Sequence, residues 1–253
     1  MKVVGIIPAR YASTRFPGKP LALIKGKPMI QRVYEQALKS VLDAVVVATD
    51  DVRIADAVMD FGGRYVMTDP NHRSGTDRCR EALELLDAQY NAVVNIQGDE
   101  PFIDPKQINQ VVELICRDDT DLASLAKRID DEDELFSPNT VKVVMDKQGN
   151  ALYFSRNPIP FMRNLDRKEW FAKGAFYKHI GIYAYKAEVL CQIADLQPTA
   201  LELAESLEQL RWLENGLNIR MGLTDSENVS IDQPKDIEKA ERFAENQMNT
   251  KND

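Results

Sequence analysis

Short apolar runs alternate with amphipathic helical segments along the first 115 residues, and this alternation limits the fold most strongly. The runs at residues 3–7, 44–48 and 92–96 are nearly continuously apolar, as expected for strands covered on both faces. Residues 65–67 form a further β-rich run. Repeated β-α-β units predict an α/β fold with a doubly wound, mainly parallel sheet and ligands at the carboxyl ends of the strands.

The middle of the chain has a different pattern. Residues 141–145 and 152–154 flank the turn-like segment 146–150, which predicts a pair of antiparallel strands. Residues 157–177 are irregular and rich in proline, aromatic and charged side chains. We therefore predict one domain over residues 1–245 with an embedded antiparallel excursion at about 150–185, used for dimerisation and sugar binding, and a mobile polar tail at 246–253.

Helical spacing predicts several individual helices. Asp51 is suited to cap a helix over 52–61, in which Ala55, Val58 and Met59 face inward. A single strong helix is expected over 201–214, and a last helix is expected to open at the segment that begins with Asp232. In the 201–214 helix the inward stripe is expected to contain Leu203, Leu207 and Leu210.

The loop after the first strand carries the strongest functional signal. It reads IPARYASTRFPGKPL, and after the end of the strand it contains two prolines, Pro17 and Pro20, a glycine and three spaced cations, Arg10, Arg15 and Lys19. Such a backbone can turn its N–H groups toward an anion, and the cations can surround phosphate oxygens. The loop is neither a Walker A motif nor a GxGxxG fingerprint, which argues against an ATPase and a dinucleotide oxidoreductase.

The distribution of charge supports a phosphate-binding role at this end of the chain. The whole protein has a formal net charge of −8, which argues against a general nucleic-acid binder. Residues 1–39 nevertheless contain eight Lys or Arg and one acid, a local charge of +7. A nucleoside triphosphate is a compact polyanion that would explain this excess, and a solvated basic face is the alternative.

The loop resembles the signature loop of sugar nucleotidyltransferases, and in its full form that of the 3-deoxy-manno-octulosonate cytidylyltransferases, or CMP-Kdo synthetases. The resemblance runs over nearly the whole chain in the same order, through VATDD (47–51), SGTDR (74–78), VNIQGDEP (94–101), ALYFSR (151–156), KHIGIYAY (178–185) and LEQLR (207–211). It implies transfer of CMP from CTP to the acidic sugar Kdo for lipopolysaccharide biosynthesis, with Mg²⁺ as cofactor and a homodimer as the assembly.

The resemblance also assigns catalytic and metal-binding residues. Arg10 and Lys19 are expected to stabilise the departing pyrophosphate, and Asp99 and Asp232 to hold the metal. Strand alternation independently puts Asp99 at the carboxyl end of a central strand. For Asp232 the alternative is a helix N-cap, because Asp-x-Pro is typical of a helix start. The local sequence SIDQP also lacks the glycine of the family's GVDTPED pattern.

The remaining site residues follow from the same resemblance, with local alternatives. The nucleotide is expected to contact Ala9, Arg10, Ser13, Arg15, Lys19, Ser74, Gly75, Arg78 and Gln97. The sugar is expected to contact Gln97, Arg156, His179, Tyr183, Glu208 and Gln209. The 74–78 motif can also be a plain helix cap. His179 and Tyr183 can also belong to a solvent-facing strand, and Glu208 and Gln209, which lie off the leucine stripe, to a solvated helix surface.

Several other classes of protein and cellular location are disfavoured. No apolar run approaches the roughly 20 residues that span a membrane, so no membrane insertion is expected. Three cysteines without a CxxC pair suit a reducing cytoplasm. The alternatives that remain are a cytidylyltransferase for another sugar acid (amino-Kdo or sialic acid), a metal-dependent glycosyltransferase and a non-catalytic nucleotide-binding regulator.

Overall fold

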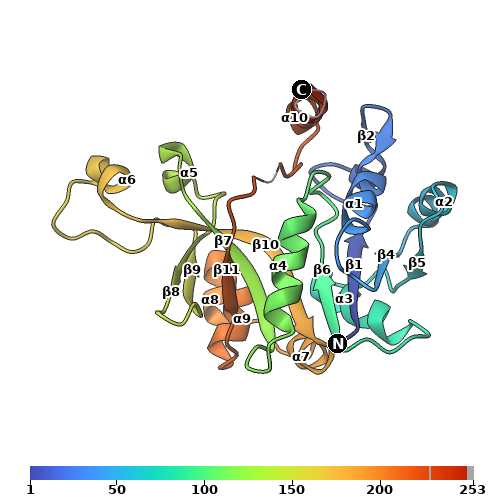
Figure 1. Cartoon of the computed structure of the whole chain (residues 1–253), viewed down its shortest axis with the longest axis horizontal. Helices are drawn as coiled ribbons and strands as arrows, with labels where there is room; N and C mark the ends of the chain where they lie inside the picture. The colour runs from blue at the N-terminus through green and yellow to red at the C-terminus, as the bar shows by residue number, and fades with distance from the viewer. Residues whose placement is uncertain (228, 250–253) are drawn as a thin grey trace. The chain divides into compact units, whose positions relative to one another are not determined.

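The computed structural model describes residues 1–227 and 229–249, and the chain divides into two compact units (Figure 1). The first unit combines Met1–Val112 with Glu227–Asp253, and the second is the continuous segment Glu113–Ser226. The second unit contains the whole excursion predicted at about 150–185 but begins near residue 113. The difference arises because the strands of the excursion pair with strands outside it.

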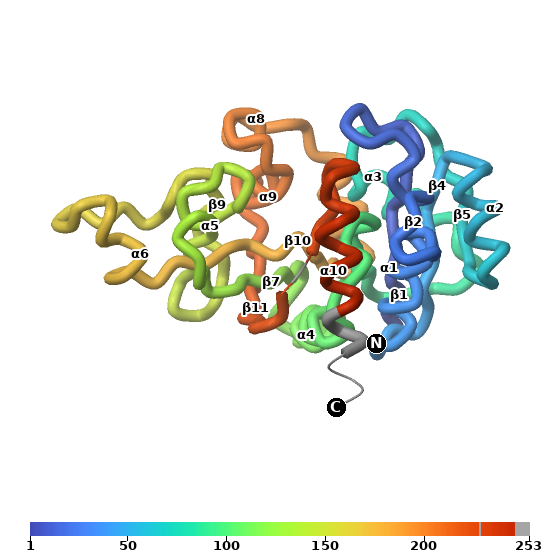
Figure 2. Tube along the Cα trace, turned by 90° about the horizontal axis from the view of Figure 1, so that it is seen from above, coloured from blue at the N-terminus to red at the C-terminus, as the bar shows by residue number. Residues whose placement is uncertain are grey.

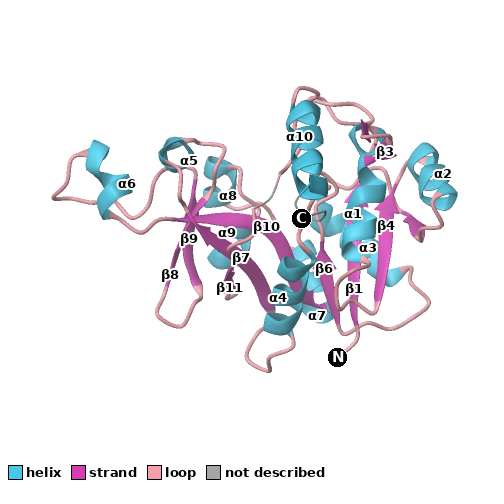
Figure 3. Ribbon diagram, turned by 45° about the horizontal axis from the view of Figure 1, so that its top comes forward, coloured by secondary structure: helices cyan, strands magenta, loops and turns pink. Residues whose placement is uncertain are grey.

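The first unit is built on a parallel sheet with the order β6-β1-β4-β5. Its strands are β1 (Val3–Ala9), β4 (Ala44–Thr49), β5 (Tyr65–Met67) and β6 (Ala92–Asn95). β1 and β6 are almost entirely buried, as their continuous apolar runs predict. Figure 3 shows β6, β1 and β4 side by side, as the strand pairing requires.

The connections between these strands reverse direction at β1. Helices α1 (Met29–Ala37) and α2 (Val52–Asp60) lead the chain outward from β1 to β4 and β5, and α3 (Gly75–Glu84) returns it to β6 on the other side of β1. Right-handed crossovers therefore place α1 and α2 on one face and α3 on the other. The carboxyl ends of β1 and β6 form a topological switch point, where α/β proteins bind ligands.

Local sequence explains how these helices begin. The Asp51 carboxylate accepts a hydrogen bond from Arg53 N and caps α2 as predicted. Ser74 and Asp77 form a reciprocal capping box at the start of α3. The prediction that Met59 faces inward is wrong, because this side chain is 51% exposed and Ile54 takes the buried position instead.

The last helix, α10 (Asp236–Asn249), packs within the first unit against the hairpin β2 (Leu23–Ile24) and β3 (Lys27–Pro28) (Figure 2). A buried cluster joins them, made of Ile24, Met29, Phe102, Val229, Ile231, Ala240 and Ala244. The helix begins four residues after the predicted start at Asp232. It also continues to Asn249 through part of the predicted tail, whose residues 250–253 lie outside the described part of the chain.

The second unit contains a mixed sheet. β7 (Leu122–Arg128) pairs in parallel with β11 (Arg220–Leu223) and antiparallel with β10 (Tyr177–Lys186). β8 (Lys142–Met145) pairs antiparallel with both β10 and β9 (Ala151–Ser155). The predicted turn between β8 and β9 is present, closed by a hydrogen bond from Asp146 N to Asn150 O.

The remaining helices of the described chain are mostly short, and most of them belong to the second unit. They are α5 (Glu132–Phe136), η2 (Arg167–Glu169), α6 (Trp170–Lys173), α7 (Ala187–Ala194), α8 (Ala200–Glu205) and α9 (Gln209–Glu214), and α4 (Pro105–Ile115) and η1 (Lys19–Leu21) complete the set for the described chain. In the excursion, Trp170 and Phe176 pack with Ile129 and Leu135 in a small apolar cluster.

The single helix predicted over 201–214 is two helices, and this correction concerns the site. α8 ends at Glu205 and is followed by Ser206, whose backbone is left-handed with a φ of 53°, and α9 starts only at Gln209. Leu207 and Leu210 are buried as predicted, but Leu203 is 69% exposed and Gln209 is buried, so the predicted stripe is right only after the break. The break changes the helical phase, which is why spacing across it misleads.

The predicted fold class is confirmed, since a mainly parallel α/β sheet is combined with smaller antiparallel elements. Within residues 1–227 and 229–249, no helix has both the length and the apolar character needed to cross a membrane.

Candidate active site

A pocket of about 260 Å³ opens in the first unit at the switch point between β1 and β6. Its walls come from the loop after β1, the start of α3 and the segment that follows β6. Its lining residues are Pro8, Ala9, Arg10, Ser13, Arg15, Lys19, Pro20, His72, Arg73, Ser74, Gly75, Arg78, Gln97, Gly98 and Asp99. All nine residues predicted to contact the nucleotide belong to this set.

The loop after β1 is held in a defined turn. Gly18 has a φ of 70°, and its N–H donates to Tyr11 O at 2.9 Å. A Cβ at Gly18 would lie 3.1 Å from the Tyr11 ring, so both the backbone angle and the available space require glycine. The turn leads directly into the short helix η1, which starts at Lys19 and directs that side chain toward Asp99.

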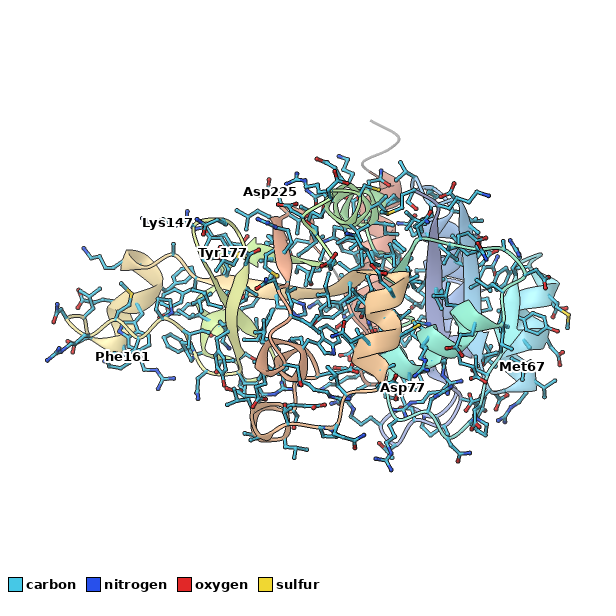
Figure 4. The ribbon with its side chains drawn as sticks, turned by 90° about the horizontal axis from the view of Figure 1, so that it is seen from below. Met67, Asp77, Lys147, Phe161, Tyr177 and Asp225 are labelled. Atoms are coloured by element: carbon cyan, nitrogen blue, oxygen red, sulfur yellow. The ribbon has the colours of Figure 1, made fainter. Side chains whose placement is uncertain are left out.

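The start of α3 forms a second wall of the pocket. For the 74–78 motif, the sequence left open a plain helix cap or a contact with the nucleotide. Ser74 Oγ accepts from Asp77 N at 3.1 Å, so the cap is present, and Ser74 also lines the pocket. Figure 4 labels Asp77 in the first turn of α3. Gly75 packs closely on Pro8, since a Cβ at Gly75 would lie 3.3 Å from Pro8 Cγ. Capping and pocket lining are therefore compatible.

Arg78 is a buried cation at the base of this wall. Its side chain pairs with Asp50 at 3.4 Å and donates to Thr68 Oγ1 at 2.5 Å. These contacts connect the SGTDR motif to the end of β4, where the VATDD motif provides Asp50. Asp50 and Thr68 thus hold the Arg78 side chain in place.

Asp99 and Asp232, far apart in the sequence, are brought together around Lys19. Lys19 Nζ lies 2.7 Å from Asp99 Oδ2, 2.9 Å from Ile231 O and 3.9 Å from Asp232 Oδ1. Arg15 Nη2 lies 3.3 Å from Asp232 Oδ1, and Ile231 N donates to Asp99 O at 3.0 Å. Asp232 is not at the N-cap position of α10, because this helix begins four residues later at Asp236, whose carboxylate accepts from the N–H groups of residues 232 and 233.

This arrangement of oxygen atoms fits a hard divalent cation. Two carboxylates and a carbonyl oxygen converge on one positive atom, the Lys19 ammonium, which stands where a cation is favoured. In the described ranges, no group of three or more Asp, Glu, His or Cys side chains is placed so that it could hold a metal ion. Two carboxylates are what Mg²⁺ typically takes from a protein that binds it together with substrate phosphates.

Five of the six predicted sugar contacts lie in the second unit, and Gln97 lies in the first. Arg156 is anchored by three carbonyls: its Nε donates to Glu205 O, its Nη1 to Pro138 O and its Nη2 to Ser206 O. The Glu205 and Ser206 carbonyls are exposed to Arg156 by the break between α8 and α9.

His179 and Tyr183 share one side of β10, as the alternation predicts. Their ring centroids are 5.2 Å apart, and His179 Nε2 lies 2.9 Å from Ser124 Oγ. Burial lowers the pKa of His179 to about 3, so the imidazole is neutral at neutral pH. Neither side chain lies on a solvent-facing strand surface.

Glu208 and Gln209 lie in the turn that opens α9. Burial first, and then the charge of Glu208, raises the pKa of Tyr183 well above its usual value, which indicates that Glu208 is close to this phenol. Gln209 is 5% exposed and is therefore not part of a solvated helix face. Gln97 lines the nucleotide pocket in the first unit, 3.5 Å from Asn95 Oδ1.

The structure adds pocket residues that the sequence analysis did not single out, namely Pro8, Pro20, His72, Arg73 and Gly98. His72 Nε2 lies 2.5 Å from Glu81 Oε2, and Arg73 is an exposed cation at the pocket edge. The sequence signal that could have identified His72 and Arg73 is their position directly before the SGTDR motif.

A cation-rich loop at the switch point of a parallel sheet, with two carboxylates beside it, is typical of an enzyme that transfers phosphate-linked groups. Residues 4–219 match the cytidylyltransferase family, and the chain belongs to that family.

Relatives of known name cover almost the whole chain. The chain is 58% identical over 250 residues to 3-deoxy-manno-octulosonate cytidylyltransferase from Parabacteroides distasonis, covering 97% of this chain and 99% of the relative. It is 54% identical over 249 residues to the protein of the same name from Bacteroides thetaiotaomicron, again with 97% and 99% coverage.

Solved structures give the same picture. CMP:2-keto-3-deoxy-manno-octonic acid synthetase, solved in complex with CTP, is 42% identical and superposes with a TM-score of 0.90 over 98% of this chain and 100% of that chain. The 4-diphosphocytidyl-2C-methyl-D-erythritol synthase from Anaerococcus prevotii is only 16% identical, with a TM-score of 0.61 over 96% of each chain, and shows the fold alone.

Proposed function

We propose that this protein transfers CMP from CTP to the anomeric hydroxyl of 3-deoxy-D-manno-octulosonate (Kdo), giving CMP-Kdo and pyrophosphate. The observation that carries the proposal is that all nine residues expected to contact the nucleotide surround one pocket. Two further observations support it: relatives named for this reaction match over nearly the full length, and a 42% identical synthetase is solved with CTP.

The reaction needs no covalent enzyme intermediate. The anomeric oxygen attacks the α-phosphorus of CTP, the bond from that phosphorus to the bridging oxygen of the β-phosphate breaks, and the hydroxyl proton passes to solvent. Arg10, Arg15 and Lys19 supply the positive charge that stabilises the departing pyrophosphate, because all three line the pocket. Catalysis then consists of positioning and charge stabilisation.

For the cofactor, we propose Mg²⁺ held by Asp99 and Asp232. When bound, the ion polarises phosphate oxygens as a Lewis acid. Lys19 and Arg15 pair with these two carboxylates and also line the nucleotide pocket, so both cations lie close to the place proposed for the triphosphate.

The sugar side of the reaction is proposed for the second unit. Arg156 offers a fixed guanidinium for the sugar's carboxylate, and His179, Tyr183, Glu208 and Gln209 offer hydrogen-bonding groups for its hydroxyls. In the neutral ring of His179, Nε2 is engaged by Ser124 Oγ at 2.9 Å, which leaves Nδ1 for a sugar hydroxyl.

We also propose the setting of the enzyme: a cytoplasmic homodimer that supplies CMP-Kdo for lipopolysaccharide biosynthesis. The excursion presents apolar surface to solvent, most clearly Phe161, which is 73% exposed and lies at the outer end of the unit in Figure 4. A second copy of the chain is the proposed cover for this surface.

The test is pyrophosphate release from CTP and Mg²⁺, measured with and without Kdo, with UTP and sialic acid as controls. Release that requires both CTP and Kdo is the expected result. Release with another sugar acid but not with Kdo would contradict the proposed substrate and leave the nucleotide pocket in place. Tight CTP binding without turnover on any sugar would contradict an enzymatic role.

A further inference from the structure

Lys142 on β8 is a fully buried lysine that the proposed reaction does not yet use. Its ammonium donates to Ser137 O at 2.8 Å and to Thr140 O at 2.5 Å. Within the described residues it makes no ion pair, which distinguishes it from buried Lys178, held by both carboxylate oxygens of Glu134 at 2.7 and 2.6 Å. Burying an ammonium that is hydrogen-bonded only to carbonyls costs folding free energy, which suggests that Lys142 has a functional role.

Lys142 lies next to the residue proposed to bind the sugar's carboxylate. It is the register partner of Ser155 on β9, immediately before Arg156. Both cations bind the same loop, 137–140: Lys142 holds the carbonyls of residues 137 and 140, and Arg156 Nη1 holds that of Pro138 at 2.9 Å. The ammonium therefore holds the loop on both sides of Pro138, whose carbonyl is one of the three that orient the Arg156 guanidinium.

The charges around this pair leave an excess of positive charge. Glu205 is the carboxylate that faces both cations, and it is already engaged by Ser155 Oγ at 2.6 Å and Arg156 N at 2.9 Å. On the other neighbouring strand, the register partner Lys178 is neutralised by Glu134. Burial, and then the charge of Arg156, lower the pKa of Lys142 to about 8, against the opposing effect of Glu205.

We propose that Lys142 is a positioning residue for the acidic sugar: it holds loop 137–140 so that Arg156 keeps its orientation, and its charge keeps this face attractive to a carboxylate. This inference rests on the proposed role of Arg156. Three of the five guanidinium N–H groups bind carbonyls, so two remain for a ligand. Glu205 balances only one of the two positive charges, and the carboxylate of an acidic sugar would balance the other.

The experiment compares wild type, Lys142→Met and Lys178→Met in steady-state pyrophosphate release, with Kdo and CTP varied separately. Methionine keeps the length of the side chain and removes its charge. We expect Lys142→Met to raise the KM for Kdo by about tenfold or more, because the variant lacks the ammonium that holds loop 137–140 and adds positive charge beside Arg156. The KM for CTP should change little. Lys178→Met is the matched control for losing a buried lysine in the same unit.

The pH profile provides a readout that a purely structural role would not change. Because Lys142 loses its proton above a pKa of about 8, kcat/KM for Kdo in the wild type should decline as the pH rises through that value. In Lys142→Met this decline should be absent. If Lys142→Met does not fold, the wild-type profile still decides, since a flat profile through pH 8 overturns the proposal.

The other outcomes are equally definite. A folded Lys142→Met protein with an unchanged KM for Kdo, or with equal losses for Kdo and CTP, overturns the positioning role and leaves the proposed function standing. A wild-type protein that turns over no sugar acid overturns the proposed function and this inference together.

Discussion

At the residue scale, Asp99 is the pocket side chain whose removal tests the metal site most directly. Its Oδ2 accepts from Lys19 at 2.7 Å, and its carbonyl accepts from Ile231, next to Asp232. Asp99→Asn keeps the shape of the side chain and removes the charge. We expect kcat to fall by about 100-fold or more with the melting temperature nearly unchanged, because charge stabilisation is lost in the transition state.

Pyrophosphate release at saturating CTP, Kdo and Mg²⁺ measures this effect. Asp87→Asn, at an exposed position of the same unit, is the control for losing one negative charge. Near-normal turnover by Asp99→Asn would remove Asp99 from the metal site.

His179 makes stability depend on pH in a predictable direction. Its pKa in the folded protein is about 3, below the ordinary value of 6.5, because burial disfavours the charged ring. As the pH falls from 6.5 toward 3, the unfolded state binds a proton that the folded state does not, so stability is lost with decreasing pH. Between pH values of about 7 and about 5 the loss from this one group is about 2 kcal/mol at most.

Urea denaturation of the wild type and His179→Gln at the two pH values measures the difference. The variant should lose less stability on acidification than the wild type. His72→Gln, which removes the chain's other histidine, is the matched control. Equal acid sensitivity of the wild type and His179→Gln would contradict the assignment.

At the scale of elements, the phosphate-binding loop is supported from α2. The Arg53 guanidinium lies over the Tyr11 ring, 3.3 Å from its centroid, and is itself held by Asp51 through Nε at 2.9 Å and Nη2 at 2.6 Å. Arg53→Met should free the loop and raise the KM for CTP by about two- to fivefold, the range expected for one exposed cation–π contact.

The readout is the KM for CTP compared with kcat, which should change less because Arg53 does not line the pocket. Arg80→Met on α3 is the control for loss of a helix-surface arginine. An unchanged KM for CTP in Arg53→Met would show that the loop holds its shape without this contact.

The break between α8 and α9 shows where element prediction from sequence reaches its limit. Leucine spacing predicts one helix over 201–214, but the carbonyls of Glu205 and Ser206 accept hydrogen bonds from Arg156 instead of from a following helical turn. The partner that competes for these carbonyls is 49 and 50 residues away in the sequence. Local periodicity cannot contain that information.

At the scale of the whole molecule, the proposed homodimer gives a test of the excursion's surface. The Phe161 ring meets Trp170 edge-on, with centroids 5.0 Å apart, and remains mostly exposed. Phe161→Asp should shift the protein from dimer toward monomer, because a charge replaces an apolar contact at the proposed interface. Light scattering coupled to size-exclusion chromatography measures the mass directly.

Met67→Asp is the matched control, since Met67 is an exposed apolar side chain of the first unit and is labelled in Figure 4. The Met67→Asp variant should have the same oligomeric mass in solution as the wild type. A Phe161→Asp protein that stays dimeric at low concentration would place the interface elsewhere.

The sequence by itself determined the parallel α/β core, the cation-bearing loop after the first strand and all nine lining residues expected around the nucleotide, because these depend on apolar runs, turn residues and motifs that are local in the chain. Only the tertiary structure decided that Lys19 lies between Asp99 and the segment of Asp232, that α8 ends where Arg156 needs carbonyls, and that Lys142 is buried beside Arg156. Each of these contacts joins residues from different elements, and which of them meet is set by how the backbones pack together.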